Sequence, residues 1–181
     1  MAKLLILYAT KQGQAKKIAD VICSQLQMDG HDCEMFNIES LPMSFSLSDY
    51  DAVIIGASVH VKSYSSILRK WISKNILELR KKPTAFYSVC LGVVQNNPEV
   101  DKDLKNILFT FFDATSWTPS IYTIFAGALP YSKYNWFMKR IMRSIAKKAG
   151  VKTDINRDYE YTNWDDVKNF AQEFGINTKS K

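Results

Sequence analysis

The chain has 181 residues, of which 46% are hydrophobic and 23% are charged, a composition typical of one soluble globular domain. No apolar run approaches the length that crosses a bilayer, and the N-terminus leads directly into a strand pattern, so we expect neither a transmembrane helix nor a signal peptide. The net charge of +6 is local, because seven of the 24 basic residues lie within 131–152, where no acid occurs, and this predicts a docking surface.

The first predicted elements are a strand, a short polar loop and a helix. The apolar run 4–7 is typical of a strand buried on both faces, and a helical period of apolar residues follows the loop. Such a junction aims several backbone N–H groups at one point, where the helix dipole adds positive charge, so an anion site is predicted. The loop lacks the glycine patterns of nucleoside triphosphate and dinucleotide sites, so one compact phosphate fits better; an ordinary turn without a ligand is the alternative. The candidates are Thr10, Lys11, Gln12, Gly13, Gln14 and Ala15.

Strand and helix patterns alternate along the rest of the chain, which predicts a parallel sheet covered by helices on both sides. The predicted strands cover 33–38, 52–56, 83–89 and 120–129, and the predicted helices cover 65–80, 100–112 and 164–174. Five such units predict an α/β fold, namely a flavodoxin-like doubly wound sheet with strand order 2-1-3-4-5. We expect a single domain over 1–175, with an insertion at about 130–158 before the last helix and a flexible tail at 176–181.

The first loop also carries a resemblance to a known family. Its pattern Tyr8-x-Thr10-x-x-Gly13-x-Ala15-x-x-x-Ala19 is similar to the signature of the flavodoxins, in which this loop wraps the phosphate of FMN. The resemblance implies FMN as the cofactor. Flavodoxins usually carry a threonine where this chain has Ala15, so one hydroxyl donor is missing while the backbone N–H remains. We therefore expect phosphate binding that is weakened rather than abolished.

Two further loops are predicted to meet the first one, because ligands of such sheets bind beyond the carboxyl ends of the strands. They cover 56–64 and 88–98, and in flavodoxins the corresponding loops sandwich the isoalloxazine ring. The resemblance implies that their serines bond polar atoms of the flavin, while small and apolar residues make flat or close contacts. The candidates are Ser58, Val59, His60, Ser88, Val89, Cys90, Leu91 and Gly92. No catalytic residue is assigned, since His60 is better explained as an incidental histidine than as a general base.

Cysteines and histidines give no sign of a metal centre. The three cysteines, Cys23, Cys33 and Cys90, lack a C-x-x-C spacing, which predicts reduced thiols in a cytosolic protein. The two histidines, His31 and His60, stand outside any cluster of metal-ligating residues, so we expect no metal.

The basic segment 131–149 has a helical period in which apolar and basic residues fall on opposite faces. Around Ile141, the apolar face gathers Tyr134, Phe137, Met138 and Ile145. The opposite face gathers Lys139, Arg140, Arg143 and Lys147, with Trp136 among them. Such a helix suits an anchor on an anionic membrane, or a platform under a planar aromatic ligand. The alternative is a helix packed on its own domain with solvated cations; nucleic acid is a weaker interpretation, because no known module accompanies the patch.

Motifs along the whole chain are similar to those of one particular family with the flavodoxin-like fold. They are Gly56-Ala57-Ser58, Phe86-Tyr87-Ser88-Val89, Ala126-Gly127-Ala128-Leu129, Tyr131, Tyr134, Trp136 and Tyr161-Thr162-x-Trp164. Together they are similar to the quinone-dependent protoporphyrinogen oxidases of bacteria. The resemblance implies oxidation of protoporphyrinogen IX in heme biosynthesis, menaquinone or ubiquinone as acceptor, and peripheral binding to the cytoplasmic side of the inner membrane. Candidates for carboxylate or lipid contacts are Lys133, Arg140 and Arg143, and candidates for apolar contacts are Tyr131 and Trp136.

Two other functions stay open at this point. A flavodoxin-type electron carrier would share the fold, although such carriers are usually acidic and this chain has a net charge of +6. An FMN-dependent NAD(P)H:quinone reductase would share both the fold and the cofactor. The sequence leaves open which quinone is used and whether the chain forms a homo-oligomer.

Overall fold

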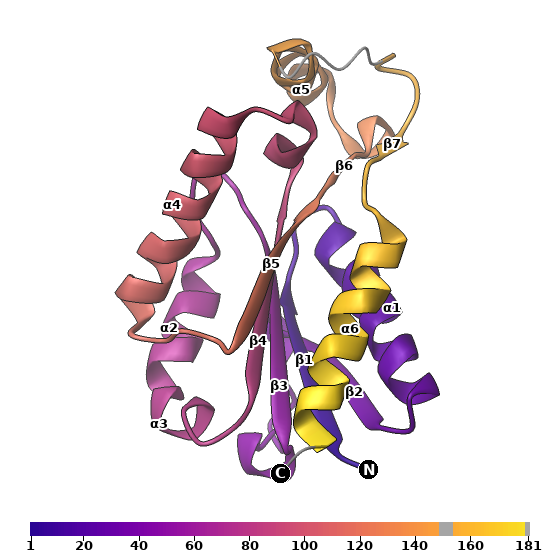
Figure 1. Cartoon of the computed structure of the whole chain (residues 1–181). Coiled ribbons are helices and arrows are strands. Elements are labelled where there is room, and N and C mark those ends of the chain that lie inside the picture. Colours follow the sequence, from indigo (N-terminus) through magenta and orange to yellow (C-terminus); the bar gives the residue numbers. More distant parts are fainter. Residues whose placement is uncertain (149–153, 180–181) are drawn as a thin grey trace.

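The computed structural model describes residues 1–148 and 154–179 (Figure 1). Its centre is a parallel sheet of five strands in the order β2-β1-β3-β4-β5, which confirms the predicted flavodoxin-like topology. The strands are β1 (Lys3–Ala9), β2 (Asp32–Asn37), β3 (Ala52–Ser58), β4 (Thr84–Cys90) and β5 (Ile121–Ala126).

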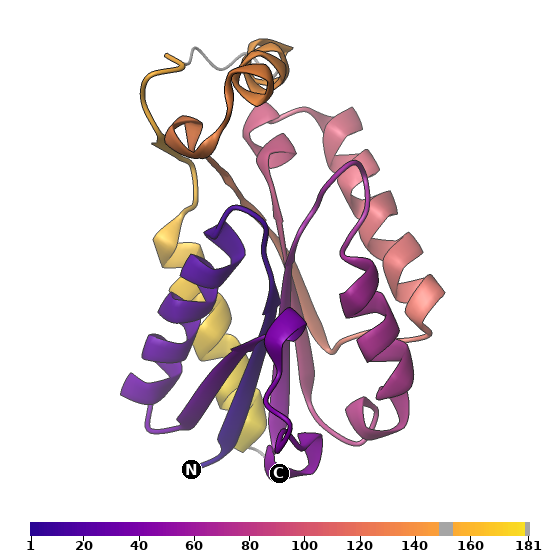
Figure 2. The ribbon, with the colours of Figure 1, turned by 180° about the vertical axis from the view of Figure 1, so that it is seen from behind.

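Helices cover both faces of the sheet (Figures 1 and 2). On one face lie α1 (Gln14–Met28) and α6 (Trp164–Lys179), and on the other lie α2 (Ser66–Lys74) and α4 (Pro98–Thr115). Because both faces are covered, successive residues of β1 enter two different cores, and the strand reads as an unbroken apolar run. The short 3-10 helices are η1 (Ile38–Ser40), η2 (Leu47–Asp49), η3 (Leu91–Gln95) and η4 (Tyr131–Lys133).

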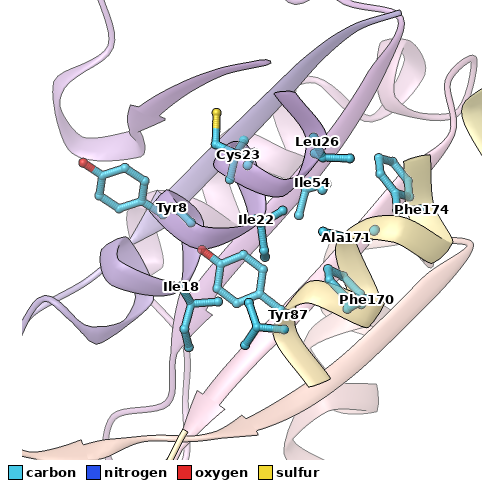
Figure 3. Packing of buried hydrophobic residues seen from close by; sticks show 14 of the residues in the cluster. Tyr8, Ile18, Ile22, Cys23, Leu26, Ile54, Tyr87, Phe170, Ala171 and Phe174 are labelled. Atoms are coloured by element: carbon cyan, nitrogen blue, oxygen red, sulfur yellow. The ribbon is translucent and has the colours of Figure 1, made fainter. Parts of the chain in front are cut away.

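The core between the sheet and the pair α1 and α6 positions the first loop. Its central residues include Ile18, Ile22, Leu26, Phe170 and Phe174 (Figure 3). Tyr87 of β4 lies fully buried in this core, and its hydroxyl donates a hydrogen bond of 2.7 Å to the backbone carbonyl of Ala15. Since Ala15 belongs to the first turn of α1, this contact ties the start of the helix to the middle of the sheet.

Gly56 of β3 makes room for this tyrosine, because the two residues are partners in the register of β3 and β4. A Cβ atom at position 56 would overlap the phenol ring of Tyr87, which is fully buried and has no space to move. We expect Gly56→Ala to lower the free energy of unfolding by about 1–3 kcal/mol, the usual cost of overpacking a core. Urea denaturation measures this change.

The control for this prediction is Gly92→Ala. An added Cβ at position 92 would meet side-chain atoms no closer than 3.4 Å, so this variant should unfold near the wild-type midpoint. An unchanged midpoint for Gly56→Ala would contradict the packing of Tyr87.

The helix predicted over 65–80 is divided in the structure. α2 ends at Lys74, and Asn75 separates it from the short α3 (Ile76–Leu79). The side-chain amide of Asn75 donates a hydrogen bond of 2.8 Å to the carbonyl of Trp71. Side-chain bonding of this kind competes with a continuous helix, which explains the break.

The strand predicted over 120–129 is also divided. β5 ends just before Gly127, and the chain then forms β6 (Ala128–Leu129), which pairs antiparallel with β7 (Tyr159–Glu160) outside the main sheet. The N–H of Gly127 donates to the last carbonyl of β4 at 3.2 Å, and its own carbonyl accepts from the N–H of Tyr161 at 3.2 Å. The insertion therefore leaves and rejoins the domain beside the carboxyl end of β4.

The inserted helix α5 (Trp136–Lys148) lies beyond the carboxyl ends of the strands (Figure 1). It begins later than residue 131, because η4 precedes it and the side-chain oxygen of Asn135 caps it by accepting from the N–H of Met138 at 2.8 Å. The last residue of the predicted helix, Ala149, lies outside the described residues.

α6 continues to Lys179, past residue 175, where the sequence predicted the domain to end, and 180–181 lie outside the described residues. Residues 176–179, which the sequence predicted to belong to a flexible tail, therefore continue this helix. Within the described part of the chain, no helix combines the length and the apolar character needed to cross a bilayer.

Candidate functional site

The loop between β1 and α1 is a compact turn. The hydroxyl of Thr10 accepts a hydrogen bond of 2.9 Å from the N–H of Gly13. Gly13 precedes the first residue of α1 with a φ of +97°, a backbone conformation that residues with a Cβ rarely adopt. As a glycine it offers no capping side chain, so the first N–H groups of α1 are left for a ligand or solvent. This is the geometry of an anion site.

The remaining side chains of this loop point in different directions. Lys11 is exposed, whereas Ala15 is fully buried. The amide of Gln14 donates to the carboxylate of Glu160 at 2.9 Å and to the hydroxyl of Thr162 at 2.8 Å. Gln14 and Ala15 therefore face β7 and the core, and they can serve an anion through their backbone N–H groups.

The loop that follows β3 lies beside the first loop. Ser58 and His60 line a cavity of about 400 Å³ together with Thr10 and Lys11. The Nε2 atom of His60 is buried and has no hydrogen-bond partner within the described residues. Burial, and then the positive charge of Lys11, lower the pKa of His60, so the imidazole is neutral at pH 7.

The segment after β4 forms η3 instead of an open loop. The carbonyl of Val89 accepts from the N–H of Val59 at 2.9 Å, which joins this segment to the loop after β3. Ser88 is buried, and its hydroxyl accepts a hydrogen bond of 2.8 Å from that of Tyr64, so the side chain belongs to the core and is not brought to the edge of the sheet. The side chain of Val89 is buried as well. The half-buried candidates in this segment are Cys90, Leu91 and Gly92.

The insertion has a small core of its own. Tyr131 is fully buried there beside Leu129, Tyr134 and Ala146, so its ring packs inside the insertion and is not available for the apolar substrate or membrane contact that the sequence predicted. The rings of Tyr131 and Tyr134 meet edge to face with their centroids 5.9 Å apart. Leu91 of η3 packs against the same cluster, which places the insertion next to the end of β4.

Two residues of the insertion reach the first loop. The ammonium group of Lys133 donates to the backbone carbonyl of Gln12 at 3.2 Å, and the hydroxyl of Tyr134 donates to the side-chain oxygen of Gln12 at 3.1 Å. With Gly13 and Met138, these residues line a cavity of about 590 Å³. The sequence assigned Lys133 to substrate or lipid and Tyr134 to an apolar face. Gln12 was a candidate of the first loop, but no local pattern pointed to its contacts with Lys133 and Tyr134, because these join residues 121 and 122 positions apart.

Among the side chains of α5 that the structure describes, those that pack against the rest of the chain lie on one side of the helix. Ala146 is buried and Met142 is half-buried, whereas Phe137, Met138 and Ile141 are 64%, 38% and 37% exposed. The side of the helix that contacts the domain therefore lies between the predicted apolar face and the predicted basic face. Of the predicted apolar face, Phe137, Met138 and Ile141 are therefore open to solvent and Tyr134 is buried, while the side chain of Ile145 lies outside the described part of the structure.

Basic residues border this open face. The guanidinium of Arg140 lies 5.4 Å from the centroid of the Trp136 ring, a cation–π contact one turn apart on the helix. Trp136 is 72% exposed, and Arg143 and Lys147 are exposed further along the same helix. The surface thus combines an accessible indole, accessible apolar side chains and several cations.

The fold and the amide-lined first loop define a protein of the flavodoxin class. The family described as Flavodoxin domain matches residues 5–156. A flavodoxin from the domain Archaea superposes with a TM-score of 0.57 at 12% identity, over 98% of this chain and 99% of that one. A WrbA-like flavodoxin from Agrobacterium tumefaciens superposes with a TM-score of 0.57 at 7% identity, over 99% of this chain and 98% of that one. At these identities the likeness shows the fold.

Relatives with higher sequence identity than these structures identify the family within this class. A protein of Escherichia coli strain K12 named protoporphyrinogen IX dehydrogenase (quinone) is 34% identical over 172 residues, which cover 94% of this chain and 93% of that protein. A protein of the same name from Leishmania major is 34% identical over 176 residues, which cover 95% of this chain and 74% of that protein. This chain belongs to the flavodoxin domain family and, within it, to the family of the protoporphyrinogen IX dehydrogenases (quinone).

Proposed function

We propose that this chain binds FMN and oxidises protoporphyrinogen IX to protoporphyrin IX in heme biosynthesis, with a quinone as the electron acceptor. The observation that carries this function is the 34% identity over 94% of the chain with a protoporphyrinogen IX dehydrogenase (quinone). The reaction removes six electrons and six protons from the porphyrinogen in three two-electron steps. Each pair of electrons, with two protons, converts one quinone to its quinol.

The residues of the first loop fit a phosphate monoester. The N–H groups at the start of α1 supply donors, and a Cβ at Gly13 would occupy the mouth of the turn. We expect the flavin ring to lie beside residues 58–60 and 90–92, whose loops are joined by the hydrogen bond between Val59 and Val89. Bound FMN would supply the two-electron redox chemistry, while the chain supplies position and electrostatics.

The exposed surface of α5 matches the chemistry of both reactants. Protoporphyrinogen IX is an apolar macrocycle with two propionates, and a membrane quinone is an apolar ring with a long chain. We expect Arg140 and Arg143 to bind the propionates or lipid phosphates, and Trp136 to contact the macrocycle or the membrane interface.

The same helix suits peripheral attachment to an anionic membrane, on the cytoplasmic side of the inner membrane. Phe137, Met138 and Ile141 face solvent, and basic residues flank them. Each basic residue contributes ~1 kcal/mol near an anionic leaflet, so attachment would be reversible and sensitive to salt. A quinone dissolved in the bilayer, menaquinone or ubiquinone, would then be within reach of the site.

The relatives favour this function over the two alternatives. The relatives from Escherichia coli and Leishmania major are both named as dehydrogenases of protoporphyrinogen IX. An electron carrier would have no substrate of its own, and an NAD(P)H:quinone reductase would take a nicotinamide. The flavodoxin-type neighbours, at 12% and 7% identity, support the fold and do not favour the electron carrier.

Anaerobic mixing of the purified yellow protein with candidate reductants tests the function. Protoporphyrinogen IX should bleach the flavin absorbance rapidly, whereas NADPH and a reduced ferredoxin reductase should leave it almost unchanged. Addition of a quinone should then restore the absorbance. Bleaching by the reductase alone would favour the electron carrier, and bleaching by NADPH alone would favour the quinone reductase.

A further inference from the structure

The first loop is contacted from outside the α/β core by the insertion. Lys133 and Tyr134 donate hydrogen bonds to the backbone and the side chain of the same residue, Gln12. Burial raises the pKa of Tyr134 to about 12, so its hydroxyl stays protonated and remains a donor at neutral pH. The turn that precedes α1 is thus held by residues that lie more than a hundred positions later in the chain.

The charge of Lys133 is directed at the anion site. A Cβ at Gly13 would lie only 3.6 Å from the ammonium nitrogen of Lys133, so the cation stands at the mouth of the turn. One of its three N–H donors goes to the carbonyl of Gln12, and the others remain for a ligand or water.

Two of the neighbouring lysines, both on α1, are paired with acids. Lys16 pairs with Asp20 at 3.0 Å, and Lys17 pairs with Glu160 at 2.8 Å. Lys133 has no carboxylate within 4 Å in the parts of the chain that the structure describes.

Asp158, an acid of the insertion that follows Lys133 in the chain, is engaged elsewhere. Its carboxylate accepts hydrogen bonds from the N–H and the hydroxyl of Ser132, at 2.8 Å and 2.6 Å. These bonds, and to a smaller extent the charge of Lys133, lower the pKa of Asp158. Asp158 is therefore held by Ser132, and the ammonium of Lys133 is left to face the turn.

We propose that Lys133 is a ligand of the FMN phosphate, supplied by the insertion, and that binding of FMN and seating of the insertion on the first loop are therefore coupled. The proposal rests on the proposed function, because it takes FMN as the ligand of this loop. Coupling is reciprocal: if the seated insertion raises the affinity for FMN, FMN stabilises the seated insertion by the same factor. The cofactor would then help to hold α5 in place.

The test compares FMN with riboflavin, which lacks the phosphate. Quenching of flavin fluorescence measures the affinity of the apoprotein for each. Lys133→Gln should lower the affinity for FMN about 10-fold, equivalent to about 1.4 kcal/mol, and should leave the affinity for riboflavin unchanged. High salt should shrink the difference between the wild type and this variant. Lys133 is exposed, so the substitution leaves the core intact.

Arg157→Gln is the matched control, since it removes an exposed cation from the same insertion and should leave both affinities unchanged. Hydrogen exchange gives a second readout: FMN should slow exchange over 131–138 in the wild type, and less so in Lys133→Gln.

Each outcome separates this proposal from the proposed function. A wild-type chain that binds no FMN would overturn the function itself. Wild-type affinity for FMN in Lys133→Gln would overturn the role of Lys133 alone. An equal loss for FMN and riboflavin would also overturn it, because the lysine would then act on the shape of the site and not on the phosphate.

Discussion

The double variant Thr10→Val with Gly13→Val is expected to lose stoichiometric FMN, with an affinity at least about 100-fold below that of the wild type. Valine would be forced into a φ of +97°, where a β-branched residue is strained by about 2 kcal/mol, so the free loop would relax away from its binding shape. The variant also loses the hydroxyl that accepts from the N–H at position 13, worth about 1 kcal/mol. Together these losses amount to about 100-fold in affinity. The flavin absorbance of the purified protein and titration with FMN measure the effect.

Gly30→Val separates loss of binding from loss of stability. Gly30 has a φ of +87° at the other end of α1, and an added Cβ there would meet no atom within 4 Å. This control carries a similar backbone strain and should lower the free energy of unfolding by about 1–2 kcal/mol without changing the affinity for FMN. A double variant that still purifies with one FMN per chain would show that the first loop is not the phosphate site.

Removing the open apolar face of α5 should release the protein from anionic vesicles. Phe137→Ser with Ile141→Ser removes two side chains that are 64% and 37% exposed, so the change should leave the domain folded. Burial of such side chains in a membrane contributes about 1.5–3 kcal/mol each when complete, and partial insertion of both predicts a loss of at least about 30-fold in vesicle partitioning. Leu77→Ser is the control, because Leu77 is 70% exposed on α3, at the opposite end of the sheet from α5 (Figure 1).

Charge reversal tests the basic part of the same surface. Arg143→Glu with Lys147→Glu should weaken vesicle binding by a similar factor at low salt, because each cation contributes ~1 kcal/mol and each new acid is repelled. Lys70→Glu with Lys74→Glu, on α2, makes the same change of charge at the same spacing and should leave binding unchanged. Sedimentation with vesicles at low and high salt measures both pairs. If the two variants of α5 sediment with vesicles as fully as their two controls, attachment through α5 is rejected.

Local sequence patterns were sufficient to predict an element whose residues are all buried. The run Leu4 to Leu7 reads as a strand buried on both faces, and it is the central part of β1 in a parallel sheet. Local patterns were insufficient where a side chain could lie either in the core or at the ligand edge of the sheet. Ser88 lies near the carboxyl end of β4, at the predicted ligand edge of the sheet, yet its hydroxyl bonds to Tyr64 in the core. Helical period placed apolar and basic residues of α5 on opposite faces, but it could not tell that Ala146, between them, would be the buried contact.

By itself the sequence determined the strand order, the turn of Thr10 and Gly13 and the family, since these depend on periodicity and on residue types at short spacing. Only the tertiary structure decided that Lys133 and Tyr134 meet Gln12 and that the apolar face of α5 stays open. The physical reason is distance along the chain. A hydrogen bond between residues 121 positions apart depends on the path of everything between them, and no local preference of either residue encodes that path.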